Sequence, residues 1–167
     1  MSHLFGKAWK FGDNITTDYI APGRYFHLRS NLEEFSKHVL KDANPEFAGK
    51  VQKGDFVVAG KNFGMGSSRE HAPAIIKIAG VSAVLAGSFS RIFFRNAINI
   101  GLPVIIMDTS FIDQGDEIRV SLGEGIVTNV TKSISKSFKP LPQVMLNILN
   151  DGGLIKHVAK NKDLVLK

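Results

Sequence analysis

Three short apolar segments in the middle of the sequence, each lying next to a glycine, limit what this chain can fold into. They span residues 54–60, 81–87 and 102–107, and short apolar runs between turn residues are typical of buried strands. Two segments with the apolar spacing of helices lie between them, at residues 69–80 and 88–101, and each ends at a glycine. The alternation of strand and helix predicts an α/β fold, in which helices cover a parallel sheet.

The flanking segments predict further elements. Alternation of apolar and polar residues predicts a short strand over residues 7–11, followed by a long ordered loop. Residues 31–40 have helical periodicity, with Asn31 as the N-cap. Residues 116–131 predict an antiparallel hairpin around Gly-Glu-Gly, and residues 141–153 predict a last helix that stops at two glycines. No internal repeat or linker interrupts the pattern, so we expect one domain over residues 1–167.

Composition places the chain among ordinary globular proteins. It has 167 residues, of which 44% are hydrophobic and 22% charged, enough for a continuous core. No apolar run approaches the ~20 residues that a membrane helix needs. The N-terminal stretch also lacks the apolar region of a secretory signal. We therefore expect a cytoplasmic protein without a membrane partner.

The sequence contains no cysteine, which excludes disulfides, thiolate metal sites and any iron–sulfur cluster held by this chain alone. The net charge is +6, and residues 130–167 hold seven lysines against two acids. Such a tail can attract nucleic acid or an acidic partner, but lysines are mostly solvated surface residues. The lysines are spaced apart without interleaved aromatic residues, so we expect no nucleic-acid partner.

The loop GKNFGMGSSREHA, residues 60–72, follows a predicted strand and opens a predicted helix. Glycines let a backbone approach a ligand closely, and a helix N-terminus binds anions. Arg69 could add a bidentate fork for a carboxylate or a phosphate. The alternative is an ordinary turn, with Ser67 or Ser68 as N-cap and a surface pair between Arg69 and Glu70. The loop has neither the lysine of a P-loop nor the Gly-x-Ser-x-Gly of a nucleophile elbow.

A second candidate segment is TTDYIAPGRYFHLR, residues 16–29. Its two arginines, Arg24 and Arg29, would suit an anionic ligand, and His27 could touch it. His71, in the glycine-rich segment, has no second ligand at metal-binding spacing, so we interpret it either as a helix-face histidine or as one that contacts the binding residues and not the ligand. We therefore predict no metal site in this chain.

Four segments taken together carry a family resemblance that none of them carries alone. They resemble the swivel domain of the aconitase superfamily, in particular the free-standing small subunits of 3-isopropylmalate dehydratase and homoaconitase. The resemblance runs over nearly the whole chain. It implies a single swivelling β/β/α domain with a mainly parallel central sheet, flanking helices and an antiparallel hairpin. The segments, in chain order, are TTDYIAPGRYFHLR, GKNFGMGSSREHA, SFSRIFFRNAINIGLPV and LNDGGLIKHV.

The resemblance also implies roles for individual residues. Ser67 falls on the catalytic base, which takes a proton from the carbon beside a substrate carboxylate. Arg69 and Arg29 fall on two carboxylate clamps, and Asp18 falls on a residue that supports a histidine of the partner domain. The loop positions expected to contact the substrate with them are Gly64, Gly66 and Ser68.

The implied activity is that of a hydro-lyase in leucine biosynthesis, which isomerises 2-isopropylmalate and 3-isopropylmalate by dehydration and rehydration. In the resembled family a [4Fe–4S] cluster held by cysteines binds the substrate hydroxyl. Because this chain has no cysteine, we expect it to bind no cofactor and to need a cluster-bearing large subunit, as a heterodimer or heterotetramer. The chain alone should be inactive.

Substrate choice stays open at this point. In the resembled family the loop at Tyr25, Phe26, His27 and Leu28 decides which side group fits beside the malate portion. Phe26 and Leu28 favour an apolar isopropyl group, whereas His27 or Arg24 could bind a third carboxylate. The alternatives are a small subunit of homoaconitase, one of another malate-derivative hydro-lyase such as dimethylmalate dehydratase, and a non-catalytic module that binds anions or RNA.

Overall fold

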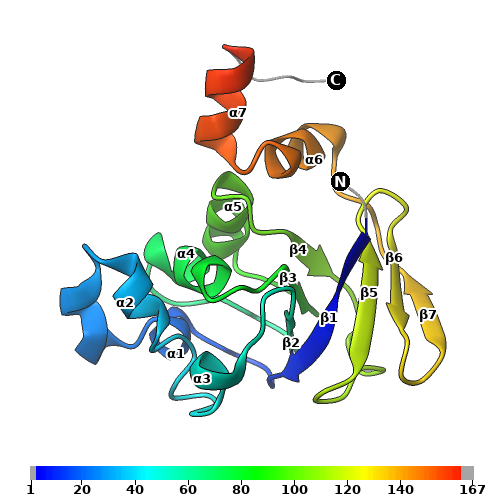
Figure 1. The fold of residues 1–167 in the computed structure, drawn as a ribbon, viewed down its shortest axis with the longest axis horizontal. Helices are drawn as coiled ribbons and strands as arrows, with labels where there is room; N and C mark the ends of the chain where they lie inside the picture. The colour runs from blue at the N-terminus through cyan, green and yellow to red at the C-terminus, as the bar shows by residue number, and fades with distance from the viewer. Residues whose placement is uncertain (1–2, 163–167) are drawn as a thin grey trace.

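The computed structural model describes residues 3–162, and one sheet of seven strands forms its centre (Figure 1). The spatial order is β4-β3-β2-β1-β5-β6-β7, in which β1 to β4 are parallel and β5 to β7 antiparallel. The predicted mixed α/β fold is therefore confirmed. The strands are β1 (His3–Lys10), β2 (Phe56–Ala59), β3 (Ala83–Ala86), β4 (Val104–Ile106), β5 (Glu117–Ser121), β6 (Ile126–Asn129) and β7 (Ile134–Ser137).

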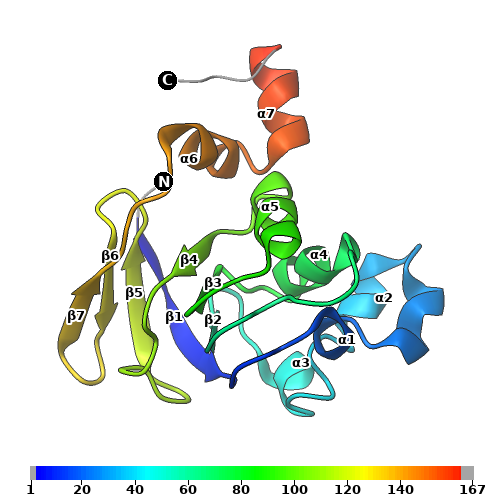
Figure 2. The same ribbon diagram turned by 180° about the vertical axis from the view of Figure 1, so that it is seen from behind.

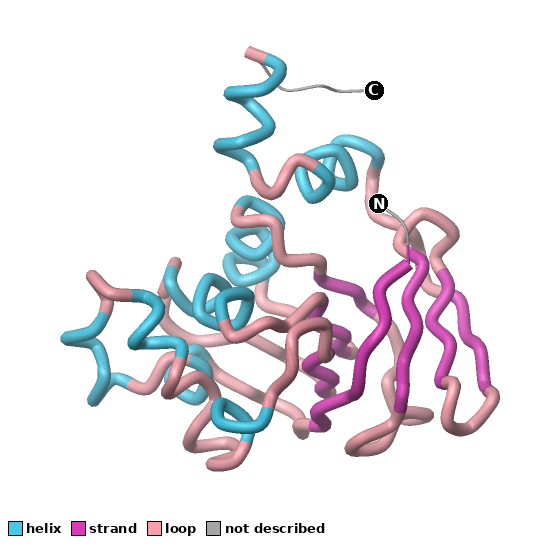
Figure 3. The backbone as a smooth tube through the Cα atoms, viewed as in Figure 1, coloured by secondary structure: helices cyan, strands magenta, loops and turns pink. Residues whose placement is uncertain are grey.

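The helices lie mainly beside the parallel strands, as a second view from behind also shows (Figure 2). In the secondary-structure view, the last two helices stand beyond the end of α5 and away from the sheet (Figure 3). The helices are α1 (Thr17–Ile20), the 3₁₀ helix η1 (Gly23–Leu28), α2 (Leu32–Ser36), α3 (Phe47–Lys50), α4 (His71–Ile78), α5 (Arg91–Asn99), α6 (Gln143–Asn150) and α7 (Leu154–Asn161). Within residues 3–162, no helix is both long and apolar enough to cross a membrane.

The central strands are apolar throughout because both faces of the sheet are covered. In β2, Val57 and Ala59 belong to the core under the helices, while Phe56 and Val58 belong to a second core. Alternate side chains of a strand point to opposite faces, so one strand serves both cores. The second core includes Ile118 of β5, which shows that the antiparallel strands curl over the far face of the sheet.

Asp55 ties the first two parallel strands together. Its carboxylate accepts hydrogen bonds from the backbone N–H of Lys7 at 3.1 Å, from Trp9 Nε1 at 3.0 Å and from the N–H of Gln52 at 2.9 Å. Asp55 is 5% exposed, and a buried carboxylate must be satisfied in this way. The bonds hold the beginning of β2 against β1, so the carboxyl ends of both strands emerge at the same edge of the sheet.

Some sequence predictions need correction in the first half of the chain. The helix predicted over residues 31–40 does begin after Asn31, whose Oδ1 accepts a hydrogen bond from Glu34 N at 3.3 Å. It ends already at Ser36, because turns follow and Leu40 adopts a φ of 54°. The long loop predicted before it contains the two short helices α1 and η1, and the later helix α3 was not predicted.

The C-terminal part also differs from the prediction. The predicted hairpin is a three-stranded unit, since β7 pairs with β6. The glycines at residues 152 and 153 end α6 as predicted, but the chain turns there and continues as α7. The buried His157 holds this turn, with Nδ1 at 2.7 Å from Asp151 Oδ2, and Lys160 pairs with the same carboxylate. Residues 163–167 of the predicted basic tail lie outside the described residues.

Candidate functional site

The candidate site lies at the carboxyl edge of the parallel strands, where open α/β sheets bind their ligands. The glycine-rich loop leaves β2 at this edge, and the segment after β3 runs beside it. Phe63 N donates to Ser88 O at 3.0 Å, and Ser90 N donates back to Phe63 O at 3.0 Å. This pairing extends the strand contact past the end of the sheet and fixes the start of the loop.

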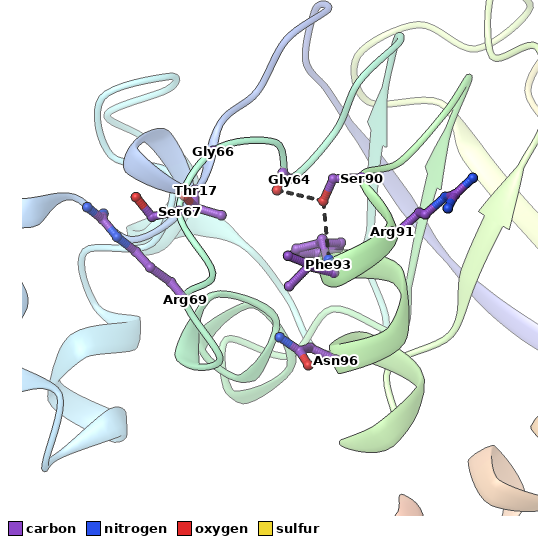
Figure 4. Close-up of a pocket in the computed structure, with 10 residues that line it drawn as sticks. Thr17, Gly64, Gly66, Ser67, Arg69, Ser90, Arg91, Phe93 and Asn96 are labelled. Atoms are coloured by element: carbon purple, nitrogen blue, oxygen red, sulfur yellow. Dashed lines mark hydrogen bonds between the residues drawn. The ribbon is translucent and has the colours of Figure 1, made fainter.

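Gly64 lies against the first turn of α5. Its φ is +81°, and a Cβ added there would lie 2.4 Å from Phe93 Cγ. Ser90 Oγ donates to Gly64 O at 2.9 Å and accepts from Phe93 N at 3.2 Å, so one hydroxyl both caps α5 and holds the loop (Figure 4). Only glycine fits this contact, because any side chain would collide with the ring.

Gly66 meets the N-terminal segment in a similar way. Its φ is +111°, and an added Cβ would lie 3.1 Å from Thr17 Oγ1. Thr17 N donates to Met65 O at 2.9 Å. The loop is therefore held on one side by α5 and on the other by α1, which carries Asp18.

Arg69 is the most strongly anchored charged group of the site. Its side chain is 13% exposed; Nη2 lies 2.6 Å from Asp18 Oδ1, and Nη1 donates to Ala21 O at 2.7 Å. Its guanidinium carbon lies 5.1 Å from the centre of the Phe26 ring, within the range of a cation–π contact. The alternative prediction of a surface pair between Arg69 and Glu70 is therefore wrong.

The two serines of the loop do not cap α4. The N-cap of that helix is Glu70, without a side-chain hydrogen bond, so the alternative interpretation of Ser67 or Ser68 as caps is also wrong. Both serines are exposed. Ser67 lines the cavity described next, whereas Ser68 does not, and the Ser67 hydroxyl has no hydrogen-bond partner among the described residues.

A cavity of about 300 Å³ opens between the glycine loop and α5 (Figure 4). The loop residues Gly64, Gly66, Ser67 and Arg69 line it, while the Ser67 hydroxyl and the Arg69 guanidinium point away from α5 (Figure 4). The loop thus carries a free hydroxyl and a fixed cation on the same side, a combination that suits a small anionic molecule. Four of the predicted site residues thus share one cavity.

Arg29, the second predicted clamp, is near this site but does not line the cavity. It is exposed, and its Nη1 donates to Phe26 O at 3.1 Å. Its guanidinium carbon lies 5.6 Å from the centre of the Phe26 ring. Phe26 therefore contacts both arginines, Arg29 and Arg69, and links them through one aromatic ring. The sequence showed no signal for this contact beyond the presence of an aromatic residue between arginines.

The other residues of the predicted specificity loop have structural partners. Tyr25 stacks on His38 with ring centres 3.8 Å apart, and its hydroxyl accepts a hydrogen bond from Lys41 at 3.3 Å. Leu28 packs against the core under the helices. His27 is exposed. Only Phe26 of the four residues contacts the arginines of the site.

Two further loop residues, Arg24 and Asp18, form ion pairs within the chain. Arg24 makes a two-bond fork to Asp42 at 2.7 and 2.6 Å, so it is paired within the chain. Asp18, expected to support a histidine of a partner, pairs here with Arg69.

His71 lies under the site at the start of α4. Its ring contacts Phe26 and Phe35, with centres 4.9 and 5.2 Å away. Nε2 is buried, without a hydrogen-bond partner among residues 3–162. Burial lowers the pKa of His71, and the positive charges of Arg69 and Arg29 lower it further. The imidazole is therefore neutral near pH 7, and the two arginines are the positive charges of this region.

The described part of the chain contains no group of three or more His, Asp or Glu side chains that could hold a metal ion. The whole sequence also lacks cysteine. The residues of this chain therefore do not fit an iron–sulfur cluster, whose iron atoms are held by thiolates.

Comparison with known proteins decides the family. Residues 17–109, which include every site residue described above, match the Aconitase C-terminal domain. The chain belongs to this family. The match covers more than half of the sequence and ends just beyond β4. It therefore includes the whole parallel part of the sheet after β1, together with the glycine-rich loop and α5.

Similarity to individual proteins extends over nearly the full length. The chain is 63% identical over 161 residues to 3-isopropylmalate dehydratase small subunit 2 of Archaeoglobus fulgidus, covering 96% of this chain and 98% of the relative. It is 52% identical over 158 residues to the methanogen homoaconitase small subunit of Methanothermobacter thermautotrophicus, covering 95% and 92%. A crystal structure of 3-isopropylmalate dehydratase from Methanocaldococcus jannaschii is 40% identical and superposes with a TM-score of 0.92, covering 96% and 95%.

The contact between Gly64 and Phe93 predicts a strong effect of a small substitution. We expect Gly64→Ala to lower the free energy of unfolding by about 1–3 kcal/mol, through overpacking and the positive φ. Gly49→Ala is the matched control, because its added methyl group meets nothing within 4 Å and lies in α3. We expect it to be neutral or slightly stabilising. Urea unfolding of each variant, followed by circular dichroism, measures the difference; an unchanged Gly64→Ala protein would contradict the packing argument.

The environment of His71 predicts a pH dependence of stability. Because the folded protein lowers the pKa of His71, folding favours the neutral ring. Its contribution is complete above the unfolded-state pKa of about 6.5 and is lost as the pH falls from there through the lower folded-state pKa. We expect His71→Phe to lose less stability than the wild type between pH 7 and 5.

Urea unfolding at a series of pH values measures this difference. His38 also has a lowered pKa but is present in both proteins, so the difference between them isolates His71. Parallel pH profiles for the wild type and His71→Phe would show that His71 does not titrate as argued.

Proposed function

We propose that this chain is the small subunit of a 3-isopropylmalate dehydratase, a hydro-lyase that interconverts 2-isopropylmalate and 3-isopropylmalate by removing and restoring water. The observation that carries the proposal is the shared cavity of Ser67, Arg69 and the glycine loop. The name of the Archaeoglobus fulgidus relative, 63% identical over 96% of this chain, supports it. In this proposal residues 1–167 act as one swivel-type domain.

The proposed chemistry begins with removal of a proton from the carbon beside a substrate carboxylate. Ser67 would accept this proton at Oγ. A serine hydroxyl is a weak base unless its surroundings stabilise the anion. The nearby guanidinium of Arg69 and the positive end of α4 would provide such stabilisation, and they would also stabilise the negative charge that develops on the substrate.

Arg69 would bind a substrate carboxylate while remaining anchored to its own chain. A guanidinium has five N–H donors, and the contacts with Asp18 and Ala21 leave donors for a ligand. We propose that Asp18 holds Arg69 in place, in addition to any contact it makes with a partner. Arg29, joined to Arg69 through the Phe26 ring, would bind a second carboxylate when substrate or partner covers this exposed side chain.

The site needs a partner to be complete. A [4Fe–4S] cluster would supply the Lewis acid that binds the substrate hydroxyl, and this chain has no cysteine to hold one. We therefore propose a separate cluster-bearing large subunit, in keeping with the words "small subunit" in the names of the relatives. The chain alone would bind anions in its cavity without turning them over.

A second candidate is the small subunit of a homoaconitase, because one relative with that name is 52% identical over 95% of this chain. The two activities share the malate portion of the substrate and differ in its side group. The part of the site that contacts this side group would therefore determine which of the two substrates is converted, and the proton-transfer residues would not.

Reconstitution tests the proposed function. The chain is mixed anaerobically with the cluster-bearing large subunit of its organism, and kcat/KM is compared for 2-isopropylmalate, homoaconitate, citrate and dimethylmalate. We expect a clear preference for 2-isopropylmalate, with no turnover by the chain alone. A formed complex with an intact cluster that converts none of the four would contradict the proposal. Salt-sensitive RNA binding by the lone chain would then favour a binding module.

In the same assay, Ser67→Ala should lower kcat by roughly 10²–10⁴-fold, the usual contribution of a general base. Folding should not change, because the Ser67 hydroxyl makes no hydrogen bond within the described part of the chain, and assembly with the large subunit is checked by measuring complex formation. The matched comparison is Ser68→Ala, whose hydroxyl is also exposed but lies outside the cavity. We expect a far smaller loss for it; wild-type turnover by an assembled Ser67→Ala complex would exclude Ser67 as the base.

A further inference from the structure

His71 contacts the aromatic ring that both candidate carboxylate clamps share. It is the first residue of α4 and follows Arg69 by two positions. Its ring centre lies 4.9 Å from that of Phe26, and the two ring planes meet at 67°. The guanidinium carbons of Arg69 and Arg29 lie 5.1 and 5.6 Å from the centre of the same Phe26 ring. The proposed proton transfer gives His71 itself no role.

The position of Arg29 follows from that of Phe26. The backbone N–H of Arg29 and its Nη1 both donate to Phe26 O, each at 3.1 Å. The guanidinium also lies over the Phe26 ring. Arg29 is exposed, and it forms no ion pair with another residue of the described range 3–162. A displacement of Phe26 would therefore displace Arg29 with it.

Phe26 needs support from the body of the protein, because it lies on a surface turn. None of the residues of η1 is buried. Tyr25 joins this turn to the fold by stacking on His38, and Leu28 joins it by packing against the core. Among residues 3–162, His71 is the aromatic side chain that contacts the Phe26 ring. Without it, Phe26 would rest on the two arginines that it has to hold.

His71 is itself well fixed. On its other side it contacts Phe35, which is fully buried, with ring centres 5.2 Å apart. Ala72, also fully buried, donates from its N–H to Arg69 O at 3.1 Å, so Arg69 and His71 belong to one turn at the start of α4. The His71 ring thus connects the turn that carries Arg69 to the ring that holds Arg29.

The contact between His71 and Phe26 depends on packing. His71 Nε2 is buried and has no hydrogen-bond partner in the described part of the chain. Burial lowers the pKa of His71; the positive charges of Arg69 and Arg29 lower it further, and only Glu70 acts in the opposite direction. A protonated ring would add a third positive charge beside the two arginines. The neutral ring supports Phe26 without this repulsion.

We propose that His71 is a positioning residue for substrate binding: its ring supports Phe26, which holds Arg29 at a fixed distance from Arg69. The inference rests on the proposed function, in which the two arginines bind two carboxylates of one substrate. The carboxylates of a small substrate have a limited range of separations. Two clamps bind them together only when the distance between the clamps matches.

The test measures KM and kcat for 2-isopropylmalate with the reconstituted complex. His71→Ala should raise KM by roughly 10–100-fold, because a small displacement of a binding group is costly. It should change kcat little, since Arg69 keeps its bonds to Asp18 and Ala21. His71→Phe should restore most of the wild-type KM, because it again places a ring beneath Phe26.

A double-mutant cycle shows whether His71 acts through Phe26. Phe26→Ala should raise KM by itself. Adding His71→Ala to it should raise KM little further, because the ring that His71 supports is already absent. Effects that multiply in the double variant would overturn the proposal, and so would equal KM values for His71→Phe and His71→Ala.

His38→Ala is the matched control. Like His71, His38 is half-buried, has a lowered pKa and has a buried ring nitrogen without a partner among residues 3–162. It stacks on Tyr25, whose ring contacts Arg24 and Lys41 and not the two clamps. We expect His38→Ala to lower stability but to leave KM unchanged. An equal rise in KM for both histidine variants would overturn the specific role of His71.

Circular dichroism and titration of the large subunit with each variant check folding and assembly. If His71→Ala does not fold, His71→Leu takes its place in the cycle, because it fills the space without a ring. A wild-type complex that converts none of the four substrates contradicts the proposed function, and this inference fails with it. An active wild-type complex whose KM is unchanged by His71→Ala or His71→Leu overturns this inference alone.

Discussion

The close approach of the Gly64 backbone to the Phe93 ring is the contact on which the site depends. It brings the loop after β2 and the helix after β3 together at the edge of the sheet, and Ser90 locks it with one hydroxyl. Tight interiors tolerate little added volume. A side chain at position 64 would therefore separate the loop that carries Ser67 from the helix that forms the opposite wall of the cavity.

The positive charges of the site, Arg69 and Arg29, are also positioned by a few specific contacts. Arg69 is fixed by Asp18 and by a backbone carbonyl, so its position costs little reorganisation when a ligand arrives. Phe26 joins it to Arg29 through an uncharged ring. His71 packs beneath them as a neutral side chain. The guanidinium groups of Arg69 and Arg29 are thus held near each other beside uncharged side chains, and an anionic ligand would stabilise this arrangement.

The parallel strands and the helices between them could be predicted because each element has its own pattern in a short stretch of sequence. Glycine-bounded apolar runs and helical spacing give strands and helices without knowledge of the rest of the chain. The strand β7 could not be found in this way: all its residues are exposed, and only pairing with β6 makes it a strand. The same holds for α7, whose turn depends on the contact between Asp151 and His157.

The same difference between local patterns and contacts made on folding applies to the residues of the site. Ser67 and Arg69 could be named from a specific motif, because their loop has a composition that few other structures need. The contacts that hold Arg69 could not be predicted, because Asp18 and Ala21 lie about 50 positions before it in the sequence and only folding brings them together.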